Sequence, residues 1–183
     1  MSDRESVPQV GLIGLGLLGK ALAQRLIQSG YAVTGYDIDE SAREAATALG
    51  VEVVESPRAV SEGCTTILLS LPNSDIRTEL LFGETAWADD LPEGTLLLDT
   101  TTGRADDLER DGTRLREMDV YLVDVCVLAS SAQVGCRDAV LLVGDAESGA
   151  VGYAEVLSCF APRVFYLGKP GDGCRMKLVA NQV

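Results

Sequence analysis

Histidine is absent from the 183-residue chain, and aromatic residues make up only 5% of it. Without histidine the protein cannot use a Ser-His-Asp triad, an imidazole base or a histidine-ligated zinc ion. Basic residues are also scarce, with 15 Lys and Arg against 28 Asp and Glu and a formal net charge of −13. Because nucleic-acid affinity comes mainly from basic side chains that neutralise phosphates, we expect no nucleic-acid partner.

Long apolar runs and paired cysteines are lacking too. The first nine residues are polar, unlike a signal peptide. The longest apolar candidate, residues 120–129, is interrupted by Asp124 and falls short of the ~18 residues that cross a bilayer. The cysteines are odd in number, without a CxxC pair, which predicts reduced thiols and no metal site; they are Cys64, Cys126, Cys136, Cys159 and Cys174. These features predict a cytoplasmic protein without membrane contact.

Short apolar runs alternate with helical stretches along the chain. Parallel strands need crossover connections, so this alternation predicts an α/β fold with helices on both faces of the sheet. Strands are expected at 10–13, 31–36, 51–54, 65–71, 95–99, 120–127, 139–143 and 163–167, and helices at 17–29, 41–49, 74–82, 106–118 and 150–160. The helix at 106–118 is expected to be charged and to face solvent. We predict a Rossmann-type, doubly wound, mainly parallel sheet that ends in the start of an interdomain helix.

A GxGxxG motif follows the first predicted strand, and its residues are Gly14, Leu15, Gly16, Leu17, Leu18 and Gly19. The motif opens a helix, and Asp37 follows 18 residues after Gly19 at the end of the second strand, which is the dinucleotide-binding fingerprint. Gly14 permits the tight turn, and Gly16 lets the backbone approach the pyrophosphate. Gly19 lets the helix pack closely on the strand. The alternative is a tight turn that is glycine-rich by chance.

Asp37 also bears on which dinucleotide would bind. A carboxylate here accepts the ribose hydroxyls of NAD, whereas the 2′-phosphate of NADP would meet a like charge. Ile38 stands where an arginine would favour NADP. The sequence therefore favours NAD over NADP, unless Asp37 is an ordinary turn residue.

Five segments together resemble the β-hydroxyacid dehydrogenases, the family of 3-hydroxyisobutyrate dehydrogenase, tartronate semialdehyde reductase and 6-phosphogluconate dehydrogenase. They are residues 11–37, 71–83 (LPNSDIRTELLFG), 99–103 (DTTTG), 123–145 and 168–182 (GKPGDGCRMKLVANQ). The last, with its GxxGxGxxxK spacing, is the most specific. The resemblance implies a dinucleotide-binding domain at 1–167 and the start of an interdomain helix at 168–183. It also implies a C-terminal helical domain, which this chain lacks, and a homodimer or homotetramer.

The resemblance assigns catalysis to Lys177 as general acid or base and to Asn181 as the residue that orients lysine or substrate. They lie at i and i+4 and so share one helix face. The alternative for Lys177 is a solvated surface charge. Leu71, Pro72 and the run Thr100, Thr101 and Thr102 are expected at the cofactor, at the carboxyl ends of their strands. Thr102 could also be the N-cap of the following helix.

This chain departs from the family where substrate is expected. Leu128, Ala129 and Ser130 replace a Ser-Gly-Gly sequence and are our candidate substrate-binding residues. Cys126 replaces a proline, a glycine is missing near Arg137, and Ala180 replaces an asparagine. A larger or more apolar substrate could fit Leu128, and Arg137 could contact a carboxylate. Cys126 is either a packing residue or, less in keeping with an apolar strand, a nucleophile.

We therefore expect an NAD-dependent oxidoreductase that transfers hydride between nicotinamide and a 3-hydroxy acid or a semialdehyde. Without the rest of its pocket wall, the chain by itself should not turn over. The alternative is a non-catalytic dinucleotide-binding module that kept the fold but lost the substrate loop.

Overall fold

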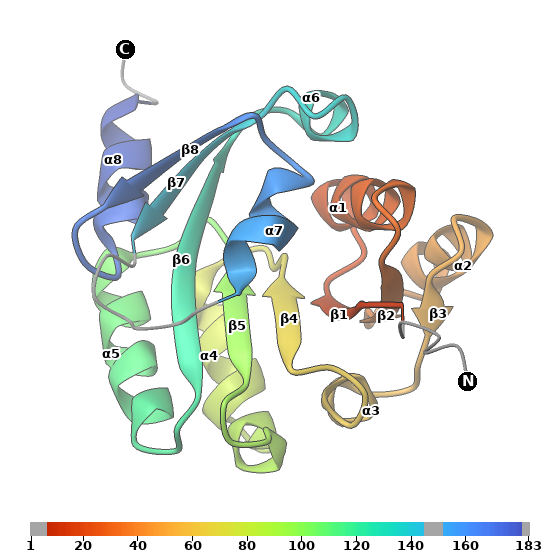
Figure 1. Ribbon diagram of the computed structural model, residues 1–183. Helices are drawn as coiled ribbons and strands as arrows, with labels where there is room; N and C mark the ends of the chain where they lie inside the picture. Colours follow the sequence, from red (N-terminus) through yellow and green to blue (C-terminus); the bar gives the residue numbers. More distant parts are fainter. Residues whose placement is uncertain (1–6, 145–151, 181–183) are drawn as a thin grey trace, which may run out of the picture.

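The computed structural model describes residues 7–144 and 152–180, which form an eight-stranded sheet covered by helices on both faces (Figure 1). The strands are β1 (Gln9–Ile13), β2 (Ala32–Tyr36), β3 (Glu52–Val53), β4 (Thr66–Leu69), β5 (Leu96–Asp99), β6 (Tyr121–Leu128), β7 (Val140–Gly144) and β8 (Arg163–Leu167). Their order in the sheet is β3-β2-β1-β4-β5-β6-β7-β8. The predicted Rossmann-type α/β fold is confirmed.

Two apolar cores, one on each face, hold the helices against the sheet. The helices are α1 (Leu17–Gln28), α2 (Glu40–Ala48), α3 (Pro57–Ser61), α4 (Ser74–Phe82), α5 (Ala105–Arg116), α6 (Ser131–Gly135), α7 (Tyr153–Ser158) and α8 (Asp172–Ala180), with a 3-10 helix η1 (Trp87–Asp90). One core contains buried residues of α1, α2, α6 and α7, and the other contains those of α3, α4, η1, α5 and α8. The sheet is therefore doubly wound.

Strand direction changes once across the sheet. β1 to β6 run parallel, but β7 pairs antiparallel with β6, from Asp124 opposite Gly144 to Leu128 opposite Val140. β8 runs parallel to β7. The predicted sheet is thus mainly parallel, as expected, with a reversed pair at one edge.

The expected helices form, and three short ones join them. The sequence prediction missed α3, η1 and α6, and the start of the helix expected at 150–160 lies outside the described residues. The prediction that the helix at 106–118 simply faces solvent is wrong. α5 buries Leu108, Leu115 and Asp111, so one face packs into the core.

A fully buried ion-pair cluster ties α4, β5 and α5 together. Nη1 of Arg77 lies 2.7 Å from Oδ2 of Asp99, and Nη2 lies 3.1 Å from Oδ2 of Asp111. Burial alone would lower the pKa of Arg77, but the two carboxylates outweigh it and raise that pKa, so the guanidinium stays charged. Oδ1 of Asp99 accepts a hydrogen bond from the Thr101 amide, which fixes the turn after β5.

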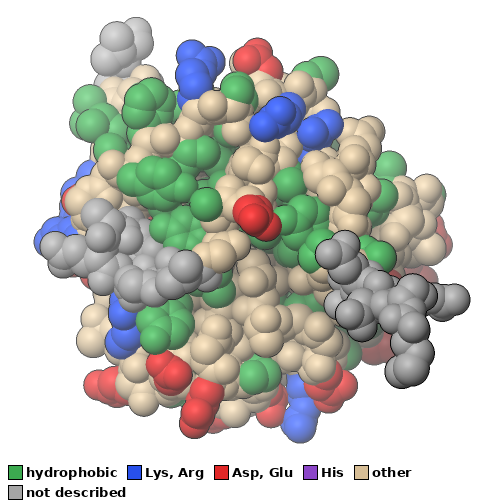
Figure 2. All heavy atoms as spheres, viewed as in Figure 1, with side chains coloured by type: hydrophobic (Ala, Val, Ile, Leu, Met, Phe, Trp, Pro, Cys, Tyr) green, Lys and Arg blue, Asp and Glu red, His purple; other side chains and the backbone are tan. Residues whose placement is uncertain are grey.

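Charge is unevenly spread over the surface. In Figure 2, acidic side chains gather mostly along the lower edge of the visible face, and several basic ones lie along its upper edge. Within residues 7–144 and 152–180, no helix has the length and apolar character that a bilayer span requires.

Candidate functional site: a dinucleotide pocket beside a lysine

The glycine loop between β1 and α1 is packed too tightly for side chains at two of its three glycines. Gly14 has a φ of +95°, and a Cβ there would overlap the carbonyl oxygen of Ser70. A Cβ at Gly19 would overlap the carbonyl oxygen of Gly14. Gly16 differs, because no described atom lies within 4 Å of its would-be Cβ. The loop is therefore pressed against the end of β4 and open to solvent at Gly16.

The N-terminus of α1 faces this opening without a cap. Gly16 is the N-cap residue, no described side chain caps it, and the first turn holds no acidic residue. The free N–H groups of a helix N-terminus and the positive end of its dipole favour an anion such as a phosphate. The loop and helix can thus cradle a pyrophosphate.

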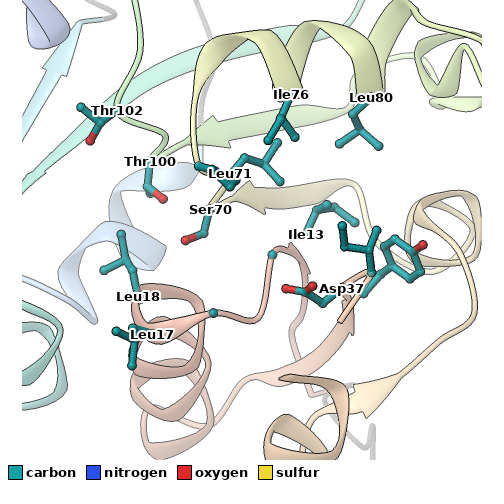
Figure 3. A pocket seen from close by; sticks show the side chains of 15 residues that line it. Ile13, Leu17, Leu18, Asp37, Ser70, Leu71, Ile76, Leu80, Thr100 and Thr102 are labelled. Carbon is teal, nitrogen blue, oxygen red and sulfur yellow. The ribbon is translucent and has the colours of Figure 1, made fainter. Parts of the chain in front are cut away.

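A cavity of about 460 Å³ extends from the loop across the carboxyl ends of the parallel strands (Figure 3). Among its lining residues are nine of the twelve predicted at the cofactor: Gly14, Gly16, Leu17, Leu18, Asp37, Leu71, Pro72, Thr100 and Thr102. The cavity is mostly apolar, with a few polar groups, which is typical of cofactor sites. It lies between α1 and α4, at the edge where open α/β sheets bind ligands.

The other three predicted cofactor residues, Leu15, Gly19 and Thr101, do not line the cavity. Thr101 is buried, and its Oγ1 accepts a hydrogen bond from the Leu71 amide. The Leu15 side chain is fully buried in the core, where it packs near Gly35, and only its backbone takes part in the loop. Gly19 is buried against Gly14. Residues that the sequence prediction missed also line the cavity: Ile13, Tyr36, Ile38, Ser70, Ile76 and Leu80. Most end a strand or lie on α4, a placement that could have been used to find them.

Asp37 lies at the end of β2 and points toward the glycine loop (Figure 3). Its Oδ2 accepts a hydrogen bond of 2.6 Å from the Leu15 amide, and its Oδ1 accepts one of 2.9 Å from the Asp39 amide. Each carboxylate oxygen has a second lone pair. Asp37 can therefore accept hydroxyl donors while it holds the loop.

The predicted lysine lies at the other end of the site. Nζ of Lys177, on α8, donates a hydrogen bond of 2.9 Å to Oγ1 of Thr102, which lines the cavity. The alternative role of Thr102, as the N-cap of the next helix, is not what the structure has, because Arg104 is the N-cap of α5. The hydroxyl of Thr102 instead connects Lys177 to the cavity.

A second hollow, of about 470 Å³, borders Lys177 and is lined by Val127, Leu128, Ala129, Gln133, Lys177 and Ala180. Two of the three predicted substrate residues are therefore next to the lysine. The third, Ser130, forms a capping box with Gln133 at the start of α6, so its hydroxyl is engaged there. Asn181 lies outside the described residues.

Arg137 does not line this hollow, and its guanidinium is hydrogen-bonded elsewhere. It has a φ of +58°, the region that favours glycine, and its Nε donates to the carbonyl of Ser158. This positive φ gives a conformational reason for the glycine that the family resemblance leads one to expect near Arg137. No described contact brings Arg137 to Lys177.

Below the second hollow, Asp124 and Cys126 of β6 meet Cys174 of α8. All three are buried, and they are the one group of potential metal ligands within the described residues. Burial raises the pKa of Asp124. The hydrogen bond with Cys174, together with burial, raises the pKa of Cys126 far above its usual range, which disfavours a thiolate nucleophile.

A family model described as the NAD binding domain of 6-phosphogluconate dehydrogenase matches residues 9–168. The chain belongs to this family. The resemblance to the β-hydroxyacid dehydrogenases is confirmed, since the matching proteins include members of that group.

Two relatives illustrate the range of the family. Mitochondrial 3-hydroxyisobutyrate dehydrogenase of Rattus norvegicus is 27% identical over 174 residues, which cover 95% of this chain and 52% of the relative. 3-Sulfolactaldehyde reductase of Escherichia coli (strain K12) is 25% identical over 172 residues, 94% of this chain and 58% of the relative. The chain thus spans little more than half the length of these relatives.

Solved structures share the fold. Mycobacterium tuberculosis 3-hydroxyisobutyrate dehydrogenase with L-serine has a TM-score of 0.89 at 22% identity, over 96% of this chain and 60% of that one. Psf3 in complex with NADP⁺ and an imine reductase variant from Myxococcus stipitatus in complex with NAD⁺ both have a TM-score of 0.85. They are 19% and 21% identical, over 94% and 96% of this chain and 61% and 60% of theirs.

Proposed function

We propose that this chain is the cofactor-binding part of an NAD-dependent oxidoreductase of the β-hydroxyacid dehydrogenase type. The reaction would move a hydride between nicotinamide and a 3-hydroxy acid, or reduce a semialdehyde. The observation that carries the proposal is the 2.9 Å hydrogen bond between Lys177 and Thr102, which puts an amine at the rim of the dinucleotide cavity. Residues 1–167 would form the dinucleotide-binding domain and 168–183 the start of an interdomain helix.

The residues around the cavity fit a dinucleotide. The uncapped start of α1 offers N–H groups to the pyrophosphate, and the open side of Gly16 leaves room for it. Asp37 offers carboxylate oxygens to a ribose, and Ile38 itself adds no positive charge to the cavity lining. The nearby Arg43 guanidinium is engaged by the carbonyl oxygens of Asp37 and Ile38. This set favours NAD over NADP. Psf3, on the same fold, binds NADP⁺, so the preference has to be measured.

The bound nicotinamide would supply the hydride chemistry, and Lys177 would handle the proton. Its amine can give a proton to a carbonyl oxygen during reduction, or take one from a hydroxyl during oxidation. Thr102 holds Nζ in place. Leu128 and Ala129 would form the substrate side of the second hollow, with Ser130 next to them. We assign Asn181, four residues further on, to the orientation of lysine or substrate.

A non-catalytic dinucleotide-binding module is the other hypothesis. Such a module has no need of an amine that is hydrogen-bonded at the cavity rim. Lys177 therefore favours the enzyme. We also propose a cytoplasmic location and, for a form with the C-terminal domain, a homodimer or homotetramer. The rat relative is named as mitochondrial, so location can differ between family members.

Cofactor preference can be tested on the chain itself. Titration followed by cofactor fluorescence should show tighter binding of NADH than of NADPH, because Asp37 repels the 2′-phosphate. Asp37→Ser should weaken NADH binding and narrow the difference in affinity between NADH and NADPH. Asp39→Asn, which changes a neighbouring carboxylate outside the cavity, is the matched control. It should change neither the NADH affinity nor the preference for NADH over NADPH. Tighter binding of NADPH by the unchanged chain would contradict the proposal.

The lysine is tested in a form that includes the C-terminal domain. Lys177→Ala should lower kcat by about 10²–10⁴-fold, the usual contribution of a positioned acid or base, with NADH affinity unchanged. Lys169→Ala removes a neighbouring amine on the loop before α8 and should retain activity. Equal turnover by Lys177→Ala would remove the lysine from the mechanism.

A further inference from the structure

Two thiols meet inside the protein where α8 packs on the sheet. Sγ of Cys126 lies 3.7 Å from Sγ of Cys174, although the two residues are 48 positions apart in the chain. Cys126 is 1% exposed and Cys174 is 3% exposed. Neither lines the dinucleotide cavity, and the proposed function uses neither.

A carboxylate completes this cluster. Both sulfur atoms lie 3.4 Å from Oδ1 of Asp124, and Oδ2 of Asp124 accepts a 3.0 Å hydrogen bond from the Cys174 amide. Two glycines keep the space around it free, because a Cβ at Gly144 or at Gly173 would lie 2.9 or 2.8 Å from Oδ2. Asp124 thereby holds the first turn of α8 on β6 and is placed to accept a proton from either thiol.

We propose that Cys126 and Cys174 are a redox-active pair, which peroxide converts into a reversible disulfide that links β6 to α8. The sulfur atoms need to approach by about 1.7 Å to reach the disulfide bond length of about 2.05 Å, which side-chain rotation at two facing cysteines can supply.

The reaction balances with hydrogen peroxide as the oxidant. Sγ of Cys174 gives its proton to Asp124 and attacks a peroxide oxygen. The O–O bond breaks, a sulfenic acid forms, and the released hydroxide takes the proton from Asp124 and leaves as water. Sγ of Cys126 then attacks the sulfenic sulfur of Cys174, and the S–S bond forms as the S–O bond breaks. The oxygen leaves as a second water, which carries the sulfenic proton and the thiol proton of Cys126. Asp124 can carry a proton between these steps. A dithiol such as dithiothreitol reverses the bond by exchange.

Because the pair is buried, we expect its oxidation to be slow and its product to be the disulfide between these two cysteines. Cys136 is the exposed cysteine, so it should meet an oxidant first, but no described thiol lies near it as a partner. Peroxide reaches Cys126 and Cys174 only when the first turn of α8 opens. The bond would then fix that turn on β6, three residues before Lys177. This consequence for Lys177 rests on the proposed function, whereas the disulfide itself does not.

The experiment uses the whole chain with Cys136→Ser, which removes the exposed thiol. The protein is treated with hydrogen peroxide or left reduced, then denatured, alkylated and analysed by mass spectrometry. The treated protein should lose two alkylatable thiols, and its unalkylated mass should fall by that of two hydrogen atoms. A proteolytic map should contain one cross-linked pair of peptides, with Cys126 and Cys174, and dithiothreitol should remove it.

Two single variants, Cys126→Ala and Cys174→Ala, serve as controls in the same background, and neither should form an intramolecular cross-link. Either variant could be less stable, so the test does not depend on them. The peptide map of the Cys136→Ser chain alone shows whether Cys126 and Cys174 are cross-linked. Separate sulfinic acids, a cross-link to Cys64 or Cys159, or four thiols that stay reduced would each overturn the proposal. NADH titration distinguishes the two proposals, since a chain that binds NADH but never cross-links refutes only this one.

Discussion

At the residue scale, the three motif glycines have different physical reasons. Gly14 and Gly19 are required by packing, because a side chain at either would overlap a carbonyl oxygen of the loop or of β4. At Gly16, by contrast, no packing contact among the described residues excludes a side chain, since the space beside it is open. A pyrophosphate that approaches the backbone closely, as we propose, would account for a glycine there.

This difference gives a paired prediction. Gly19→Ala should lower the thermal stability, because its Cβ has to displace the Gly14 carbonyl. Gly16→Ala should leave the Tm nearly unchanged but weaken NADH binding, since its methyl group enters the space proposed for pyrophosphate. Thermal unfolding and NADH titration of both variants check this. A Gly16→Ala chain with full affinity would place the pyrophosphate elsewhere.

The sequence predicted the backbone of the site better than its side chains. The motif located the glycines and Asp37 because each has a fixed geometric role. It could not show that the Leu15 side chain points into the core, since variable positions of the motif carry no such information. Ser130 was expected at substrate, but three residues later Gln133 completes a capping box with it, a signal that the sequence did contain.

At the scale of elements, Arg77 is the main polar link between α4, β5 and α5. Arg77→Met should lower the free energy of unfolding by about 3–5 kcal/mol, because it leaves the Asp99 carboxylate buried without its arginine and removes one of the two arginines from Asp111. The matched control is Arg58→Met, which breaks an ion pair whose arginine is 65% exposed and should cost only about 0–1 kcal/mol. Chemical denaturation measures both. Equal losses would mean that the buried cluster contributes no more than a surface pair.

Elements were predictable where their pattern was long. The strands and the longer helices were found from apolar runs, helical spacing and terminal glycines. The five-residue helices α3 and α6 were missed because one turn is too short for an apolar periodicity. α5 was read as solvent-facing because its charges dominate, but Asp111 is buried against Arg77, a partner 34 positions away that spacing could not reveal.

For the whole molecule, the net charge of −13 has a measurable effect on stability. Like charges repel one another more in the compact state than in the unfolded chain, and salt screens this repulsion. The Tm should therefore rise when NaCl is increased at neutral pH, by about 2–4 °C for each kcal/mol of repulsion removed. Sucrose at matched osmolality separates screening from solvent exclusion. A Tm that falls with NaCl would mean that the surface ion pairs outweigh the net repulsion.

The reversed strand pair was the part of the topology that the sequence prediction left undescribed. Only 11 residues, 129–139, separate β6 from β7. A parallel crossover needs about a dozen or more residues, so this short connection favours the antiparallel return that β7 makes. The direction was thus encoded in a loop length rather than in the strands.

The hydrogen bond from the Leu15 amide to Asp37 has a thermodynamic consequence for ligand capture. It ties the glycine loop to the end of β2 and so makes the cradle preorganised, with its ordering entropy already lost during folding. Association should therefore proceed without a slow rearrangement step, and calorimetry of NADH binding should register little entropic penalty from the loop. Without the Asp37 carboxylate, the glycine loop would lose its conformational entropy only when NADH binds, and calorimetry should then register a less favourable binding entropy.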